Sequence, residues 1–316
     1  MASSELKAMV KGAYDLQQLR MQTGLRLCAN FRSKLKEHDT DEPEEVDGEL
    51  SEKAKKILDV LRDSYKTLTE GIARNRTLPA RAGFVGNELI STYSELVLID
   101  QFIALEREES RQFRLFEGLL EEEPIYNKYL VNQRGIGPAM AGVIISGLDP
   151  AKARHVSSFW KYVGVDVEPV TGEGRSRRAE HLVEREYKDR NGNPATRMGI
   201  TYNPWLKTKL VGVLTGNFLR SNSPWRTVYD NYKHRLESDP NRLKVTVGKW
   251  KQLHKSLTRE ELRVYWTPGR IDRAAKRYML KMFLQDLWVE WRTLEGLPVT
   301  KPYAEAKLGM RPHAAE

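Results

Sequence analysis

The chain has 316 residues, of which 40% are hydrophobic, and a net charge of +9, so it can form one large or two medium domains with a real core. The single cysteine, Cys28, excludes an intrachain disulfide and fits a reducing compartment. No apolar run reaches membrane-spanning length and the N-terminus has no apolar signal core, so we expect a soluble cytoplasmic protein without a membrane partner.

The charge is unevenly distributed along the chain. Residues 1–123 hold 18 Lys and Arg against 24 Asp and Glu, whereas residues 124–316 hold 34 against 19. A basic half beside an acidic half points to a polyanion as the partner of the basic half. A lysine-rich surface that is merely solvated would have the same composition.

The first part of the chain is predicted to be helical. Apolar residues recur at roughly helical spacing over residues 4–36. Nine of the 17 residues from Glu37 to Lys53 are acidic, which predicts an exposed linker. Ser51 has the character of an N-cap for a helix that continues to about Leu68. Residues 1–85 are therefore interpreted as an N-terminal helical segment with an acidic linker at about 37–53.

A long helix is predicted over residues 86–123. Its apolar residues keep a spacing of three to four, and no Gly or Pro interrupts residues 87–117. A helix of this length needs a partner, so we expect a coiled coil or a hairpin, within the chain or with a second copy. One helix of a larger bundle is the alternative, and a homodimer is expected if the partner is a second copy.

The basic part, residues 124–316, is predicted to be a mainly helical domain with a small β-hairpin insertion. Pro124 is expected to end the long helix, and Asn191-Gly192 to form the hairpin turn. Further helices are expected at residues 126–133, from Pro138 to Leu148, at 157–165 (ending on Gly164), 203–220, 224–236 and 271–295.

The turn Gly-Ile-Gly-Pro at residues 135–138 has two interpretations. Its glycines allow a sharp turn, and the helix after it begins with unpaired N–H groups and a partial positive charge, which suit a phosphate. Alternatively, the turn serves only packing. The candidate phosphate-binding residues here are Arg134, Gly135, Gly137 and Met140.

Basic and aromatic residues alternate in the C-terminal half, a pattern typical of nucleic-acid binding, although about half of these aromatics must belong to the core. Three tryptophans are candidates for stacking on unpaired bases, each beside a cation: Trp160 with Lys161, Trp205 with Lys207, and Trp225 with Arg226. The last helix carries a basic stripe that could follow a phosphate backbone, or simply face solvent: Arg270, Arg273, Arg277 and Lys281.

The segment PVTGEGRSRR at 169–178 is predicted to be a mobile anion-binding loop through Arg175, Arg177 and Arg178. Thr171 or Ser176 could act as a nucleophile on a phosphodiester. No partner base is evident from the spacing, so a loop that only binds phosphate is favoured. Neither a Walker motif nor paired Cys and His residues occur, which predicts no nucleotide or metal cofactor.

Taken in order, the segments GIGPAMAGVIISGLD, FWKYVGV, PVTGEG, NPWLK and AAKRYM resemble the C-terminal domain of the bridge-RNA-guided insertion-sequence transposases. That domain is similar to the Nop domain of box C/D guide-RNA proteins, in which a long coiled coil precedes an RNA-binding bundle. The resemblance covers roughly residues 86–295. The GIGP segment is its specific part, and the other segments support it by order and spacing.

Two departures limit what the resemblance implies. Residues 1–85 match no acidic constellation of the RuvC-like domain of these transposases, and Thr171 stands at the position of their nucleophilic serine. What remains resembles the RNA-binding part alone, as in the Tas effectors of TIGR arrays.

The resemblance therefore implies a Nop-like protein that binds a small guide RNA and engages target DNA through it, without a catalytic domain. Two alternatives stay open. One is a reduced transposase or recombinase that acts through Thr171 or Ser176. The other is an accessory protein that binds duplex DNA through a helix-hairpin-helix turn.

Overall fold

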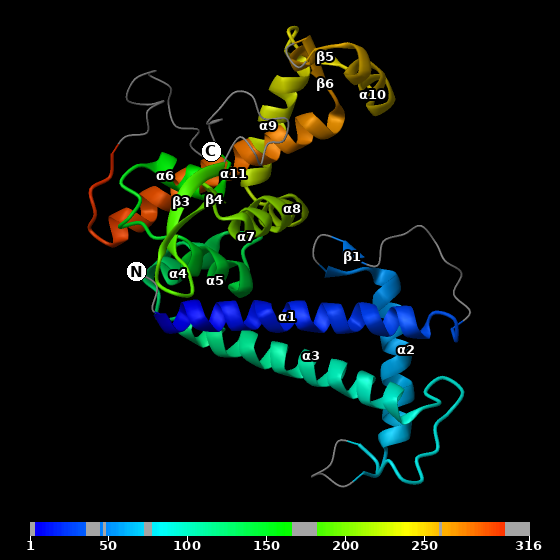
Figure 1. Ribbon diagram of the computed structural model, residues 1–316. Helices are drawn as coiled ribbons and strands as arrows, with labels where there is room; N and C mark the ends of the chain where they lie inside the picture. Colours follow the sequence, from blue (N-terminus) through cyan, green and yellow to red (C-terminus); the bar gives the residue numbers. More distant parts are fainter. Residues whose placement is uncertain are drawn as a thin grey trace. The chain divides into compact units, whose positions relative to one another are not determined.

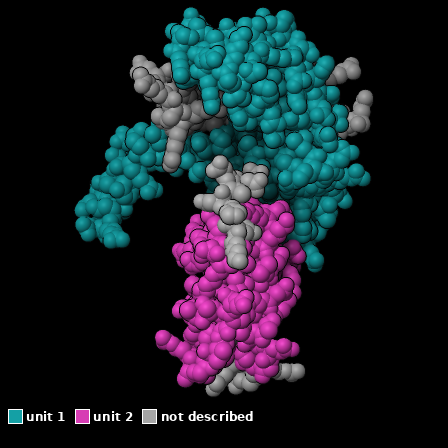
Figure 2. All heavy atoms as spheres, turned by 90° about the vertical axis from the view of Figure 1, so that its right-hand side faces the viewer, with its two compact units in different colours: residues 1–2, 120–316 teal, residues 3–119 magenta. Residues whose placement is uncertain are grey.

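The computed structural model describes residues 4–35, 45–46, 49–72, 78–165, 182–258 and 261–300. Residues 3–119 form one compact unit, called unit 2, and residues 120–316 with residues 1–2 form the other, unit 1 (Figure 2). The described part of the chain is mainly helical and contains a small antiparallel hairpin, which confirms the coarse fold class. No helix in these ranges is long and apolar enough to cross a lipid bilayer.

Unit 2 is built around two long helices that lie side by side and run in opposite directions (Figure 1). The ring centroids of Tyr14 and Phe113 are 5.6 Å apart at one end, and Lys34 pairs with Glu95 at 2.6 Å at the other. The long helix predicted at 86–123 therefore has a partner within its own chain. The elements of unit 2 are α1 (Ser4–Phe31), β1 (Glu45–Val46), β2 (Glu49–Leu50), α2 (Glu52–Thr69) and α3 (Tyr93–Leu120).

Helix α2 crosses this pair and closes its core. Ser51 is the N-cap of α2, as predicted, and its Oγ accepts a hydrogen bond from the N–H of Ala54 at 3.2 Å. Leu50 is only 5% exposed, so the predicted acidic linker ends before this residue. Gly24 of α1 allows the close approach, because an added Cβ would lie 3.1 Å from both Leu50 and Phe102.

The contact between α1 and α3 contains a buried carboxylate. Glu109 is 7% exposed and pairs with the guanidinium of Arg20, while the amide of Gln17 donates to it at 3.4 Å. A buried charge is tolerated when it is paired and hydrogen-bonded, and breaking such a pair is costly. The contact therefore favours one register of α1 against α3.

Helix α3 begins at Tyr93, not at Gly86 as predicted. The segment before it instead folds back on itself. The Oδ1 of Asn87 accepts from the N–H groups of Leu89 and Ile90 at 3.1 and 2.7 Å. An added Cβ at Gly86 would lie 2.2 Å from the carbonyl oxygen of Ile90, so the turn requires glycine.

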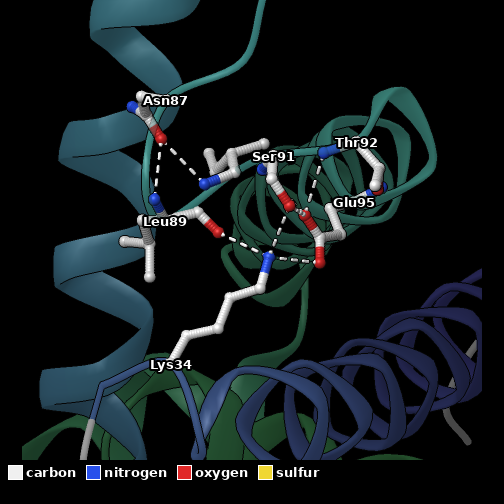
Figure 3. A network of polar contacts seen from close by, with 7 residues as sticks. Lys34, Asn87, Leu89, Ser91, Thr92 and Glu95 are labelled. Carbon is white, nitrogen blue, oxygen red and sulfur yellow. Dashed lines mark hydrogen bonds and ion pairs between the residues drawn. The ribbon is translucent and has the colours of Figure 1, made fainter.

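A capping box sets this start, and Figure 3 shows its contacts. The Thr92 hydroxyl accepts from the N–H of Glu95 at 3.3 Å, and the Glu95 carboxylate accepts from the N–H groups of Ser91 and Thr92 at 2.9 and 3.1 Å. Lys34 donates to Glu95, to the Ser91 hydroxyl and to the carbonyl of Leu89. The motif Thr-x-x-Glu at 92–95 is the sequence signal that the periodicity argument overlooked.

Unit 1 is organised around its long last helix, α11. The ring of Phe283 on α11 lies 5.6 Å from Trp225 and 5.2 Å from Phe218, and Tyr232 stacks on Tyr278 at 4.0 Å. Because the later residue of α9 pairs with the earlier residue of α11, α9 runs antiparallel to α11, as Figure 1 also shows. The elements are α4 (Pro124–Lys128), η1 (Leu130–Asn132), α5 (Pro138–Gly147), α6 (Val156–Val163), β3 (Leu182–Lys188), β4 (Pro194–Ile200), α7 (Pro204–Lys207), η3 (Thr208–Leu214), α8 (Thr215–Arg220), α9 (Trp225–Ser238), β5 (Leu243–Lys244), α10 (Val247–Ser256), η4 (Glu261–Val264), β6 (Tyr265–Trp266) and α11 (Pro268–Leu294).

The predicted turns of unit 1 are confirmed, with one correction. Gly192 lies in the hairpin turn with φ +84°, and Gly164 ends α6 with φ +77°. Pro138 is the first residue of α5, as expected. Pro124, however, does not terminate the long helix, because α3 already ends at Leu120 and Pro124 opens α4.

Two tyrosines tie helices to α11 through carboxylates. The hydroxyl of Tyr129 donates to Asp286 at 2.6 Å, and that of Tyr229 donates to Asp272 at 2.7 Å. Burial, with the neighbouring carboxylate, raises the pKa of both phenols well above the ordinary value. Both side chains therefore act as neutral donors that hold the bundle together.

Candidate nucleic-acid interface

The Gly-Ile-Gly-Pro turn packs closely against the end of α8. Gly135 has φ +94°, and an added Cβ would lie 2.8 Å from the Ser221 Oγ and 3.1 Å from the backbone of Asn217. Glycine is therefore required at 135 both by conformation and by space. Gly137 differs, because an added Cβ there would meet nothing within 4 Å. The backbone at Gly137 faces open space.

Helix α5 starts at this open position without a side-chain cap. Gly137 is its N-cap and has no side chain that could bond to the first turn, and Pro138 is its first residue. The start of a helix has a partial positive charge that favours an anion. Met140 is 5% exposed and belongs to the core, so only its backbone can serve the predicted role. Arg134 is exposed beside the turn.

The turn and the end of α8 border a shallow hollow of about 450 Å³ that is open to solvent. The Nη2 of Arg220 donates to the Oδ1 of Asn217 at 2.7 Å, which holds the guanidinium at the rim. Among the described residues that line it there is no carboxylate, and together they supply a cation, a hydroxyl, an amide and a helix start. Its lining consists of Gly135, Ile136, Gly137, Asn217, Arg220 and Ser221.

The residues from α8 were not predicted from the sequence, because their position depends on an irregular helix. Residues 204–220 form one continuous helical stretch whose central part, η3, has π-helical hydrogen bonding. Its buried apolar residues recur every four positions, and the wider π turn keeps them on one face longer than an α-helix would. They are Leu206, Leu210, Leu214 and Phe218.

Two of the three candidate tryptophans hold elements together. The indole N–H of Trp160 donates to the carbonyl of Lys281 at 3.0 Å, and that of Trp225 donates to the Oε1 of Gln133 at 3.0 Å. Trp205 is 38% exposed at the start of α7, so its ring remains accessible to a base. The structure thus favours Trp205 among the three for stacking.

Trp205 belongs to a surface cluster where α6 ends and α7 begins. The N–H of Asn203 donates to the carbonyl of Tyr162 at 2.8 Å, and the Nζ of Lys207 lies 4.3 Å from the ring centroid of Tyr202. Tyr162 is 45% exposed. Lys161 is also exposed on α6. Two exposed aromatic rings near cations suit unpaired bases and their phosphates.

The predicted basic stripe of α11 is only partly presented to solvent. Arg270 lies 4.1 Å from the Trp266 ring and donates to the carbonyl of Tyr265 at 2.8 Å. Lys281 lies 4.7 Å from the Trp160 ring. Arg273 is exposed, whereas Arg277 is half-buried. The two ends of the stripe therefore contribute to packing.

The remaining candidates divide in a similar way. Arg226 is exposed and pairs with Asp230 at 3.5 Å. Thr171, Arg175, Ser176, Arg177 and Arg178 lie outside the described residues. In the part of the chain that the structure describes, no three His, Cys, Asp or Glu side chains are grouped so that they could hold a metal ion.

Comparison with known proteins finds no matching family model, curated sequence or solved structure.

Proposed function

We propose that this chain is a guide-RNA-binding protein with a Nop-like helical domain, which engages target DNA through its RNA and has no nuclease domain of its own. The hollow between the Gly-Ile-Gly-Pro turn and the end of α8 carries this proposal. Its guanidinium, its hydroxyl and the partial positive charge of the α5 start are groups that favour a phosphate oxygen.

Single-stranded RNA fits the surface of unit 1 better than a free phosphate does. Trp205 and Tyr162 expose aromatic rings, and Lys207 lies nearby, which suits splayed bases of a folded RNA. The motif order that resembles the guide-RNA proteins supports the same class. Base pairing would then supply sequence recognition, and the protein would hold the RNA by shape and charge.

The proposal includes a second copy of the chain. The long helix was expected to need a partner, and α1 now lies along α3 within the same unit. A dimer formed through α3 would have to use the faces of α1 and α3 that are not already packed together.

The first test is to express the protein with its native flanking DNA, purify it through a high-salt wash, and sequence the RNA that remains bound. One abundant, discrete small RNA encoded beside the gene is the expected result. Arg220→Gln should reduce the retained RNA several-fold, because it removes a charged phosphate contact. Arg111→Gln, an exposed arginine of unit 2, is the matched control and should retain it.

Other outcomes would replace the proposal. Binding of duplex DNA with no RNA would indicate the accessory DNA-binding protein. A covalent adduct with DNA that disappears in Thr171→Ala would indicate the recombinase. Equal RNA retention by Arg220→Gln and the wild type would remove the hollow from the interface.

A further inference from the structure

Helix α10 projects from the α9–α11 pair without a core of its own. None of its ten residues is buried, although the chain around it is well anchored. Strands β5 and β6 pair in parallel at its base, with Leu243 opposite Tyr265 and Lys244 opposite Trp266. Figure 1 shows α10 beside the α9–α11 pair, and the exposed residues of α10 are available to a partner.

The base of this projection is held by an arginine–tryptophan sandwich. The guanidinium carbons of Arg242 and Arg270 lie 4.3 and 4.1 Å from the ring centroid of Trp266. Arg242 is also paired with Asp239 at 2.7 Å. These contacts fix where α10 begins, so the helix is presented at a defined place on unit 1.

The segment that contains α10 is cationic and has no acidic residue. Residues 243–258 include four lysines and one histidine but neither Asp nor Glu. Lys251, His254 and Lys255 are exposed, whereas Trp250 and Leu253 are half-buried. At about 100° per residue, Lys251 and Lys255 lie on one side of the helix, away from Trp250 and Leu253, whereas His254 lies beside Trp250. One face of α10 therefore carries a row of two exposed lysines.

We propose that this face of α10 contacts the phosphate backbone of a duplex nucleic acid, such as the guide–target duplex. The inference rests on the proposed function and adds a second contact surface to it. Charge complementarity identifies the partner, because phosphates attract such a row whatever the sequence.

The side chains favour a duplex over a single strand. Trp250 is half-buried and its ring lies 4.8 Å from that of His254, so α10 has no fully exposed aromatic ring for an unpaired base. Its cations are lysines, which contact phosphates as point charges, and not arginines, which read base edges bidentately. Val247 is the only exposed large apolar residue of the helix, which disfavours a protein interface.

The test compares duplex binding by the full chain carrying Lys251→Gln and Lys255→Gln with that of a matched control. The control, Lys11→Gln with Lys56→Gln, makes the same charge change at exposed positions of α1 and α2. The probe is a mixed-sequence DNA duplex of roughly 20 bp, titrated at several salt concentrations. Losing two phosphate contacts should weaken binding by about tenfold or more near 0.1 M salt and lower the slope of log K against log salt by about 2.

Retention of copurified RNA should not change in the α10 variant, which separates this inference from the proposed function. Equal duplex affinity in the α10 variant and the wild type would overturn the inference, as would an equal loss in the control. Stronger loss for the matching single strand than for the duplex would also overturn it. Binding of an acidic protein, with no binding of the duplex, would assign the face to a protein partner and refute the inference.

Discussion

At the residue scale, two glycines of one turn have different reasons to be glycine. Gly135 is constrained by a positive φ and by the backbone of α8, whereas Gly137 is constrained by neither. The sequence motif alone gives no reason to distinguish the two glycines. The distinction follows from the approach of α8, which local sequence does not encode.

Gly135→Ala should therefore destabilise unit 1 by about 1–3 kcal/mol, because the new Cβ strains the backbone and presses on Ser221 and Asn217. Urea unfolding followed by tryptophan fluorescence measures this change. Gly248→Ala is the control, since it adds a methyl group to a helix position with nothing within 4 Å and should be neutral or slightly stabilising. Similar stabilities for the two variants would contradict the account of the turn.

The carboxylate of Glu95 illustrates how a single residue responds to pH. Burial alone would raise its pKa, but the hydrogen bonds from Lys34 and from the N–H groups of Thr92 and Ser91 lower it overall. A lowered pKa in the folded state adds stability above the ordinary pKa of glutamate, and that stability is lost as pH falls through the lowered value.

Glu95→Gln should destabilise unit 2 by about 1 kcal/mol at neutral pH, because the variant loses the ion pair and part of the capping box. The difference in the free energy of unfolding between variant and wild type should shrink as the pH falls through the lowered pKa of Glu95, because the wild-type carboxylate then also becomes protonated. Denaturant midpoints by circular dichroism at neutral and acidic pH measure it. The control is Glu88→Gln, at an exposed glutamate of the segment before α3, which should have the same denaturant midpoint as the wild type at both pH values.

At the element scale, periodic apolar spacing predicted where helices occur, but contacts from elsewhere in the chain fixed their ends and neighbours. Local signals predict the α-helical character, the Ser51 cap of α2, the end of α6 at Gly164 and the hairpin at Asn191-Gly192. The partner of α3 and the π segment η3 depend on distant residues. Helix α10 escaped prediction because it buries no residue and so has no apolar period.

The candidate site was predictable to a similar degree. The turn at 135–138 carries a recognisable local motif, whereas Asn217, Arg220 and Ser221 reach it only through the fold of unit 1. Charge and aromatic content could suggest Trp160 and Trp225 as contacts for bases, but could not show that their indole N–H groups are used inside the protein.

At the scale of the whole molecule, the tryptophans give a fluorescence probe for one unit alone. All seven tryptophans lie at residue 160 or beyond, so tryptophan fluorescence reports on unit 1 and circular dichroism reports on both units. Phe102 is fully buried in the core of unit 2.

Phe102→Ala should destabilise unit 2 by about 3–5 kcal/mol through the cavity it leaves. The variant should lose part of its helical signal at lower denaturant, while the midpoint of tryptophan fluorescence stays at the wild-type value. Coincident shifts of both probes would mean that the two units unfold as one cooperative block.

The π-helical segment η3 determines which side chains of the following helix line the hollow. Each residue added to or removed from a helix rotates everything beyond it by about 100°. A one-residue deletion within Thr208–Leu214 would leave every lining side chain in the sequence, yet it would turn Asn217, Arg220 and Ser221 away from Gly135. The hollow thus depends on the number of residues before it as much as on their identity. Insertions or deletions upstream would change which side chains face the Gly-Ile-Gly-Pro turn without substituting any residue that lines the hollow.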